Sequence, residues 1–124
     1  TSVNSFEEKL HICDEAMQIS NVFRDTWFSN ETRVIRSYVE LARCIYEVAE
    51  LMSTRGMENS QDQESMSGCL RELEAAGKEN TAAIGVWRED LGPEPWQYRV
   101  HDAIAATEST VADISSHIST RYIY

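Results

Sequence analysis

Residues 34–52 read VIRSYVELARCIYEVAELM, and apolar side chains recur along this segment at alternating steps of four and three residues. The members of this row are Val34, Tyr38, Leu41, Ile45, Val48 and Met52. An α-helix has about 3.6 residues per turn, so this spacing places the row along one helix face. The segment therefore predicts a long α-helix with one buried side.

A second apolar row lies beside the first and widens the hydrophobic surface of this helix. It consists of Ile35, Val39, Ala42, Tyr46 and Ala49. The charged residues of the segment fall on only two neighbouring heptad positions, so the polar stripe is narrow. A helix at the edge of a small bundle normally has a broader polar side. We therefore expect this helix to be central or to be covered from two sides.

The composition predicts one globular domain, because 124 residues are enough to bury a core without disulfides or metals. The net charge of −10 comes from acidic residues spread along the whole chain, with no basic patch. Nucleic acids and anionic membranes are recognised by clustered Lys and Arg, so neither is an expected partner. We interpret the acidic surface as a solubilising one rather than a mimic of DNA. No apolar run approaches the length of a membrane span.

The remaining chain divides into three further helical segments. Ser5 and Glu8 form a capping box at the start of the first helix, which we expect to end near Phe28, with Ser29 and Asn30 in the joint. Further joints are expected near 56–64, where Gly56 stops the second helix and a third restarts by about Ser65, and near 91–95. Pro95 is well placed to begin the fourth helix.

The third helical segment allows two interpretations. Its apolar row runs from Met66 through Leu70 and Leu73 to Ile84, but the weak members Gly77 and Asn80 interrupt it. Either residues 77–80 break the helix in two, since interior Gly costs about 1 kcal/mol relative to Ala, or Asn80 is a buried polar residue that fixes register. The unbroken phase favours a continuous helix.

Four such helices with short joints predict an all-α, antiparallel, up-down-up-down four-helix bundle spanning residues 1–124. No segment alternates at period two in the way a sheet requires. The predicted topology gathers aromatic residues from the first and third joints at one end. They are Trp27, Tyr38, Trp87, Trp96 and Tyr98.

No catalytic or metal-binding motif is complete. Glu8 and His11 have the Glu-x-x-His spacing of di-iron bundles, but the motif does not recur and His11 lies on the polar face. Glu47 and Glu50 resemble the paired glutamates of all-α nucleoside-triphosphate pyrophosphohydrolases, but the second acidic motif of those enzymes is missing. His101, Asp102 and His117 accompany no nucleophile with a recognisable signature. We therefore expect no cofactor and no metal.

The three cysteines also show no pattern of a functional site. Cys13, Cys44 and Cys69 form no CxxC pair, and an odd number cannot be fully paired within one chain. We expect small buried or half-buried thiols in a reducing compartment, and hence a cytoplasmic location. The sequon at residues 30–32 would be used only if the chain were secreted, a possibility that the sequence leaves open.

These observations lead to the hypothesis that the chain is a non-enzymatic helical module that binds a protein partner. The partner that we expect is a second copy of the chain. Val39, Tyr46 and Leu51 are its candidate partner-binding residues, because they point to sides of the second helix that a four-helix core leaves partly wet. The alternative is a small-molecule pocket at the aromatic end, formed by Trp27, Tyr38, Trp87, Trp96 and Tyr98. An all-α hydrolase is a third and weaker alternative.

Overall fold

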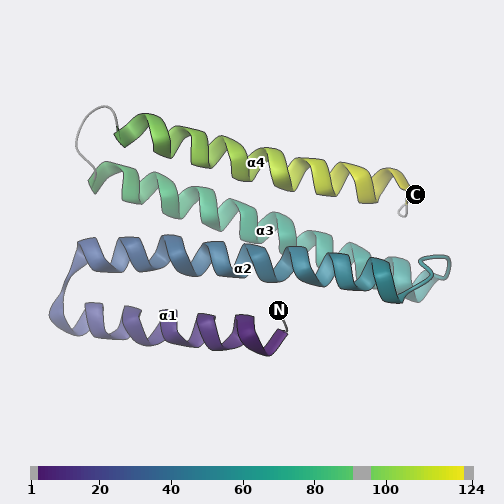
Figure 1. Ribbon diagram of the computed structural model, residues 1–124, viewed down its shortest axis with the longest axis horizontal. Helices are drawn as coiled ribbons and strands as arrows, with labels where there is room; N and C mark the ends of the chain where they lie inside the picture. Colours follow the sequence, from purple (N-terminus) through teal and green to yellow (C-terminus); the bar gives the residue numbers. More distant parts are fainter. Residues whose placement is uncertain (1–2, 91–95, 122–124) are drawn as a thin grey trace.

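The computed structural model describes the backbone of residues 3–90 and 96–121, and the side chains of residues 5–89 and 102–121. These ranges contain no strand and are dominated by α1 (Val3–Phe23), α2 (Thr26–Thr54), α3 (Ser60–Asp90) and α4 (Trp96–Arg121). Successive helices run antiparallel (Figure 1), so the predicted all-α, up-down-up-down four-helix bundle is confirmed. None of the described helices combines the length and the apolar character needed to cross a membrane.

The first joint lies at residues 24–25, so its predicted position near residues 28–31 was wrong. Arg24 adopts a left-handed backbone with φ of 54°, and the Asp25 carboxylate accepts a hydrogen bond from the Phe28 amide at 3.0 Å as the N-cap of α2. The amides of Arg24 and Asp25 also donate back to the carbonyls of Asn21 and Ser20. This pattern closes a helix end, usually with glycine in the left-handed position.

Two other boundaries also differ from the prediction. The second joint is shorter than expected, because α3 begins at Ser60 rather than near Ser65. Asn59 explains the early start: its side-chain oxygen accepts a hydrogen bond from the Asp62 amide at 2.8 Å, which satisfies a free helix donor. The first helix begins at Val3, so Ser5 lies inside its first turn. The predicted joint near residues 91–95 lies outside the described residues.

The third helix is continuous through Gly77 and Asn80, as its apolar phase predicted. Asn80 is buried and joins three helices: its Nδ2 donates to Ser37 Oγ on α2 at 3.0 Å, and Thr107 Oγ1 on α4 donates to its Oδ1 at 2.8 Å. At Gly77 an added Cβ would lie 2.8 Å from Val111 Cγ2, so the absent side chain lets α4 approach closely. Gly77 and Asn80, which interrupt the apolar row, therefore both contribute to the packing of the bundle.

The main core lies between α2, α3 and α4. Its buried members come mostly from α2 and α3, with Ile118 contributed by α4: they are Leu41, Cys44, Val48, Met57, Met66, Leu70, Leu73 and Ala76. Met57, in the second joint, is buried although its φ of 62° is left-handed. Three helices thus share one hydrophobic cluster of the kind that supplies most of the stability of a small domain.

The first helix is peripheral. Within the described part of the chain, Cα atoms come within 8 Å only between helices that are consecutive in sequence, so α1 packs on α2 alone. Phe6 and Cys13 are its buried hydrophobic side chains, and the Phe6 ring lies against the Tyr46 ring with centroids 5.7 Å apart. Figure 1 shows α1 on the side of α2 away from α4. The bundle is consequently open between its first and last helices.

Candidate functional site

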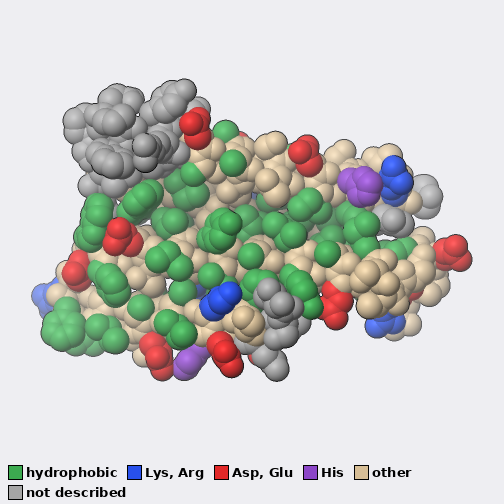
Figure 2. Space-filling view, in the orientation of Figure 1, with side chains coloured by type: hydrophobic (Ala, Val, Ile, Leu, Met, Phe, Trp, Pro, Cys, Tyr) green, Lys and Arg blue, Asp and Glu red, His purple; other side chains and the backbone are tan. Residues whose placement is uncertain are grey.

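An apolar groove runs between α2 and α4. Its first part has a volume of about 230 Å³ and its second about 350 Å³, and the two parts adjoin at Ile45, which lines both. From α2 the lining also includes Tyr38, Leu41, Ala42, Val48, Ala49 and Met52, and from α4 it includes Ala106, Thr107, Thr110, Asp113, Ile114, His117 and Ile118. In Figure 2, hydrophobic side chains gather over this part of the molecule.

The groove exists because the apolar surface of α2 is wider than its neighbours cover. The α2 residues that face α3 are buried, and Tyr46 on the opposite side meets α1. Between these sides a strip of α2 carrying Tyr38, Ala42 and Ala49 borders α4 without being covered by it. Tyr38 is 64% exposed and the nearby Ile35 is 58% exposed. Large hydrophobic residues exposed side by side commonly mark a binding surface.

The three predicted partner-binding residues lie in different surroundings. Tyr46 contacts Phe6 of α1, and Leu51 is half-buried against the core between α2 and α3. Val39 is half-buried. Ile35 and Tyr38 are more exposed than any of these three residues. The sequence placed both in the apolar rows of the helix, but it did not distinguish them from the core residues of those rows. The signal that could have found them is the position of the first joint, which fixes the side of α2 that α1 covers.

Three of the helix ends that were predicted to carry the aromatic residues lie at one end of the bundle. The start of α2, the end of α3 and the start of α4 lie together at the left of Figure 1, which brings the segments of Trp27, Trp87 and Trp96 to one end of the bundle. Trp27 is 44% exposed, whereas Trp87 is half-buried and its Nε1 is buried with no hydrogen-bond partner. The side chains of Trp96 and Tyr98 lie outside the described residues.

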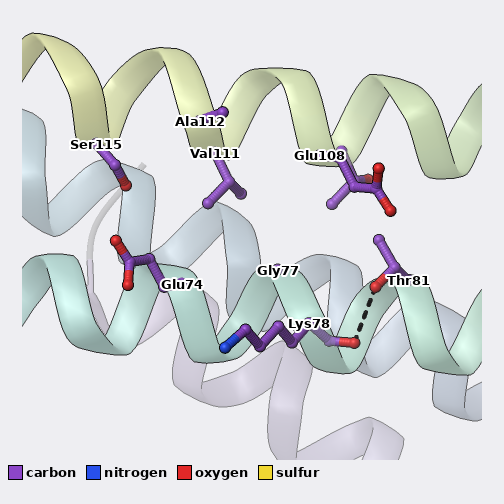
Figure 3. Close-up of a pocket in the computed structure, with 9 residues that line it drawn as sticks. Glu74, Gly77, Lys78, Thr81, Glu108, Val111, Ala112 and Ser115 are labelled. Atoms are coloured by element: carbon purple, nitrogen blue, oxygen red, sulfur yellow. Dashed lines mark hydrogen bonds between the residues drawn. The ribbon is translucent and has the colours of Figure 1, made fainter.

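A second hollow, with a volume of about 390 Å³, lies between α3 and α4 beside Gly77 (Figure 3). Its small lining residues, Gly77, Ala112 and Ser115, leave space, and the charged chains of Glu74, Lys78 and Glu108 also line it. Ser115 Oγ is buried and has no hydrogen-bond partner. The lining contains no histidine or cysteine.

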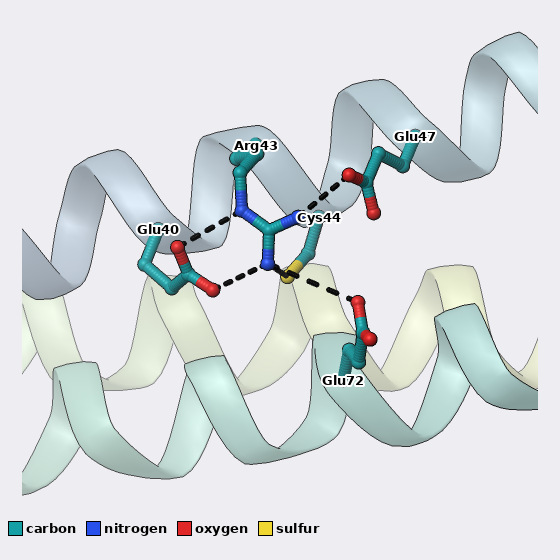
Figure 4. Close-up of polar contacts among 5 residues, drawn as sticks. All are labelled: Glu40, Arg43, Cys44, Glu47 and Glu72. Carbon is teal, nitrogen blue, oxygen red and sulfur yellow. Dashed lines mark hydrogen bonds and ion pairs between the residues drawn. The ribbon is translucent and has the colours of Figure 1, made fainter. Parts of the chain in front are cut away.

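On α2, outside the groove, Arg43 contacts three glutamates (Figure 4). Arg43 donates through Nη1 to Glu47 Oε1 at 2.6 Å and through Nε to Glu40 Oε2 at 3.0 Å, and its Nη2 lies 3.8 Å from Glu72 Oε2 on α3. The hydrogen bond from Arg43 holds the pKa of Glu40 below its ordinary value. The Glu47 carboxylate is therefore paired with an arginine of its own helix.

This network predicts a measurable pH dependence. Because the pKa of Glu40 in the folded chain is below its ordinary 4.5, the ionised carboxylate stabilises the fold above pH 4.5 and loses this effect as the pH falls below it. Glu40→Gln should lower the stability by about 0.5–1 kcal/mol at pH 7 and have a smaller effect at pH 3. Melting curves of the two proteins at both pH values measure the difference. An equal loss of stability at both pH values would contradict the prediction. Glu7→Gln, on the exposed face of α1, is the control.

Among the side chains that the structure describes, the cysteines and histidines are not grouped into a reactive centre. Burial raises the pKa of the Cys44 thiol to about 11 and raises the pKa of Cys13 and Cys69 as well, so all three are protonated near neutral pH and are weak nucleophiles. His11 is exposed and pairs with Glu15 at 3.0 Å on the same helix. Among the described residues, no three His, Cys, Asp or Glu side chains are grouped as metal ligands would be.

Comparison with protein families, with characterised proteins and with solved structures gave no match.

Proposed function

We propose that the chain is a non-enzymatic helical interaction module that binds a second copy of itself through the groove between α2 and α4. The observation that carries this proposal is the largely apolar lining of the groove, from Tyr38 to Met52 on α2 and from Ala106 to Ile118 on α4. Along α2 this corresponds to roughly 20 Å of helix, about four turns. A groove of this length between two helices suits the apolar face of a third helix.

The charge distribution of the groove allows a second copy to be the occupant. The chain carries a net charge of −10, so two copies repel each other over most of their surfaces. The groove carries fewer charges than the rest of the surface. Its titratable lining residues are Asp113, His117 and Tyr38. Two grooves can therefore meet without bringing many carboxylates together. Added salt should strengthen this contact by screening the remaining repulsion, whereas it would weaken binding of a basic partner.

Matched alanine substitutions test the groove directly. Ala49 and Ala106 are exposed and line it, one from each helix, whereas Ala75 and Ala82 are exposed on α3 outside it. Ala49→Glu with Ala106→Glu should weaken self-association at least about tenfold, because four carboxylates per dimer would have to lose water in an apolar contact. Ala75→Glu with Ala82→Glu makes the same change in charge and should leave the association unchanged. Sedimentation at several concentrations measures both constants.

The proposal would be contradicted if both double variants changed the association equally, since the effect would then come from net charge alone. Circular dichroism should show the same helix content in all of them, because each substituted alanine is exposed. If the unmodified chain is a monomer throughout, the small-molecule pocket at the aromatic end becomes the better candidate. The observation that favours that alternative is the buried and unpaired indole Nε1 of Trp87.

A further inference from the structure

The turn between α1 and α2 carries four large hydrophobic residues on the surface. Val22 and Phe23 at the end of α1 are 78% and 77% exposed, and Trp27 and Phe28 at the start of α2 are 44% and 42% exposed. We call these four residues the tip cluster. They lie at the end of the bundle, and the groove between α2 and α4 does not include them. A soluble monomer gains nothing from exposing such a cluster, which suggests that it is buried in another state of the protein.

The joint inside the tip cluster is short and strained. Only Arg24 and Asp25 separate the two helices, and Arg24 has a left-handed backbone with φ of 54°. Residues with a Cβ rarely adopt this conformation, because the side chain crowds the following carbonyl. If Arg24 and Asp25 took helical angles instead, α1 and α2 would form one continuous helix. The strain at Arg24 would disappear and helical hydrogen bonds would replace those of the turn.

The contacts of α1 could be made by the α1 of another copy. In the described part of the chain α1 packs on α2 alone. Its contacts there include the Phe6 ring on Tyr46, the hydrogen bond from Arg36 Nε to Asp14 Oδ1 at 2.6 Å, and the Ser29 hydroxyl 3.7 Å from the Met17 sulfur. None of these contacts depends on which chain supplies α1. Exchange of a terminal helix between copies therefore preserves them.

We propose that two copies of the chain exchange α1. The joint at residues 24–25 straightens in each copy, and the α1 of one copy packs on the α2 of the other through the same contacts. The two long helices then run antiparallel, and the two joints lie next to each other at the two-fold axis. This arrangement brings the tip clusters of the two copies close together at that axis. The contact is separate from the groove and does not depend on it.

Two substitutions at Arg24 test the exchange. Arg24→Gly and Arg24→Ala both remove the charged side chain, but glycine accepts the left-handed turn whereas alanine favours a continuous helix. Each dimer contains two joints, so the dissociation constant of the glycine variant should exceed that of the alanine variant by at least about a hundredfold. Equal constants would overturn the exchange, even if the protein dimerises. Such a dimer would still be sensitive to the groove substitutions, so the two proposals fail independently.

A cross-linking experiment tests the exchange in a second way. One chain carries Asp14→Cys and another carries Arg36→Cys, each with the three native cysteines replaced by alanine, and circular dichroism first confirms that both are helical. The two are mixed, unfolded and refolded together, and treated with a short bismaleimide. Exchange places position 14 of one chain beside position 36 of the other and should give a covalent dimer containing both chains. If α1 stays on its own α2, only chains without this cross-link are recovered, which would overturn the proposal.

Discussion

Replacing Asn80 by aspartate is expected to destabilise the fold by about 3–5 kcal/mol at pH 7, because it places an unpaired negative charge in a buried site. Asn80 is 1% exposed and its two side-chain partners are the hydroxyls of Ser37 and Thr107. The Ser37 hydroxyl donates its hydrogen to the Val34 carbonyl at 2.9 Å, so it can donate to a carboxylate only by giving up that bond. A loss of this size is a large part of the stability of a typical domain.

The same variant should show a pH dependence of known sign. Burial raises the pKa of the introduced carboxyl group, so the group becomes neutral as the pH falls and the deficit relative to the natural chain should shrink toward pH 4. Urea denaturation at both pH values measures it. Asn21→Asp, at an exposed position of α1, is the control and should change the stability by no more than about 0.5 kcal/mol. A small loss for Asn80→Asp at pH 7 would show that this site is open to water.

Leu73→Ala is expected to cost about 3–4 kcal/mol, because Leu73 is completely buried where α2, α3 and α4 meet. Leu10 on α1 is only half-buried, and we expect Leu10→Ala to cost about 1 kcal/mol. Urea midpoints with unchanged slopes give both values. The contrast tests whether stability is concentrated in the three-helix core. Similar losses at the two positions would mean that α1 belongs to the core as fully as α3 does.

The sequence predicted the helices and their order, because long apolar rows at helical spacing leave few alternatives. It also indicated that α3 is continuous, since the phase survives Gly77 and Asn80. The first joint could not be placed in this way. The apolar pattern continues across residues 23–28, and the left-handed residue is Arg24 rather than a glycine, so the usual stop signal is missing. Only the hydrogen bonds of the turn reveal where α1 ends.

The candidate site was less accessible to sequence reasoning for a related reason. The excess apolar surface of α2 was visible in the pattern, but the side on which it stays exposed depends on where α1 packs. With the joint at residues 24–25, α1 covers Tyr46, and the surface bordering α4 carries Tyr38 and Ala42. The predicted residue Leu51 packs on the core side of α2 instead. A helical wheel gives the width of an apolar face but does not identify its neighbours.

The central claim is that the chain acts through contact with another copy of itself. Light scattering of the unmodified protein over a range of concentrations tests this claim most directly. We predict a mass that rises with concentration from the 14.1 kDa of one chain to at least twice that value, and that rises further at the same concentration when salt is added. A mass that stays at 14.1 kDa at every concentration and salt level would contradict it.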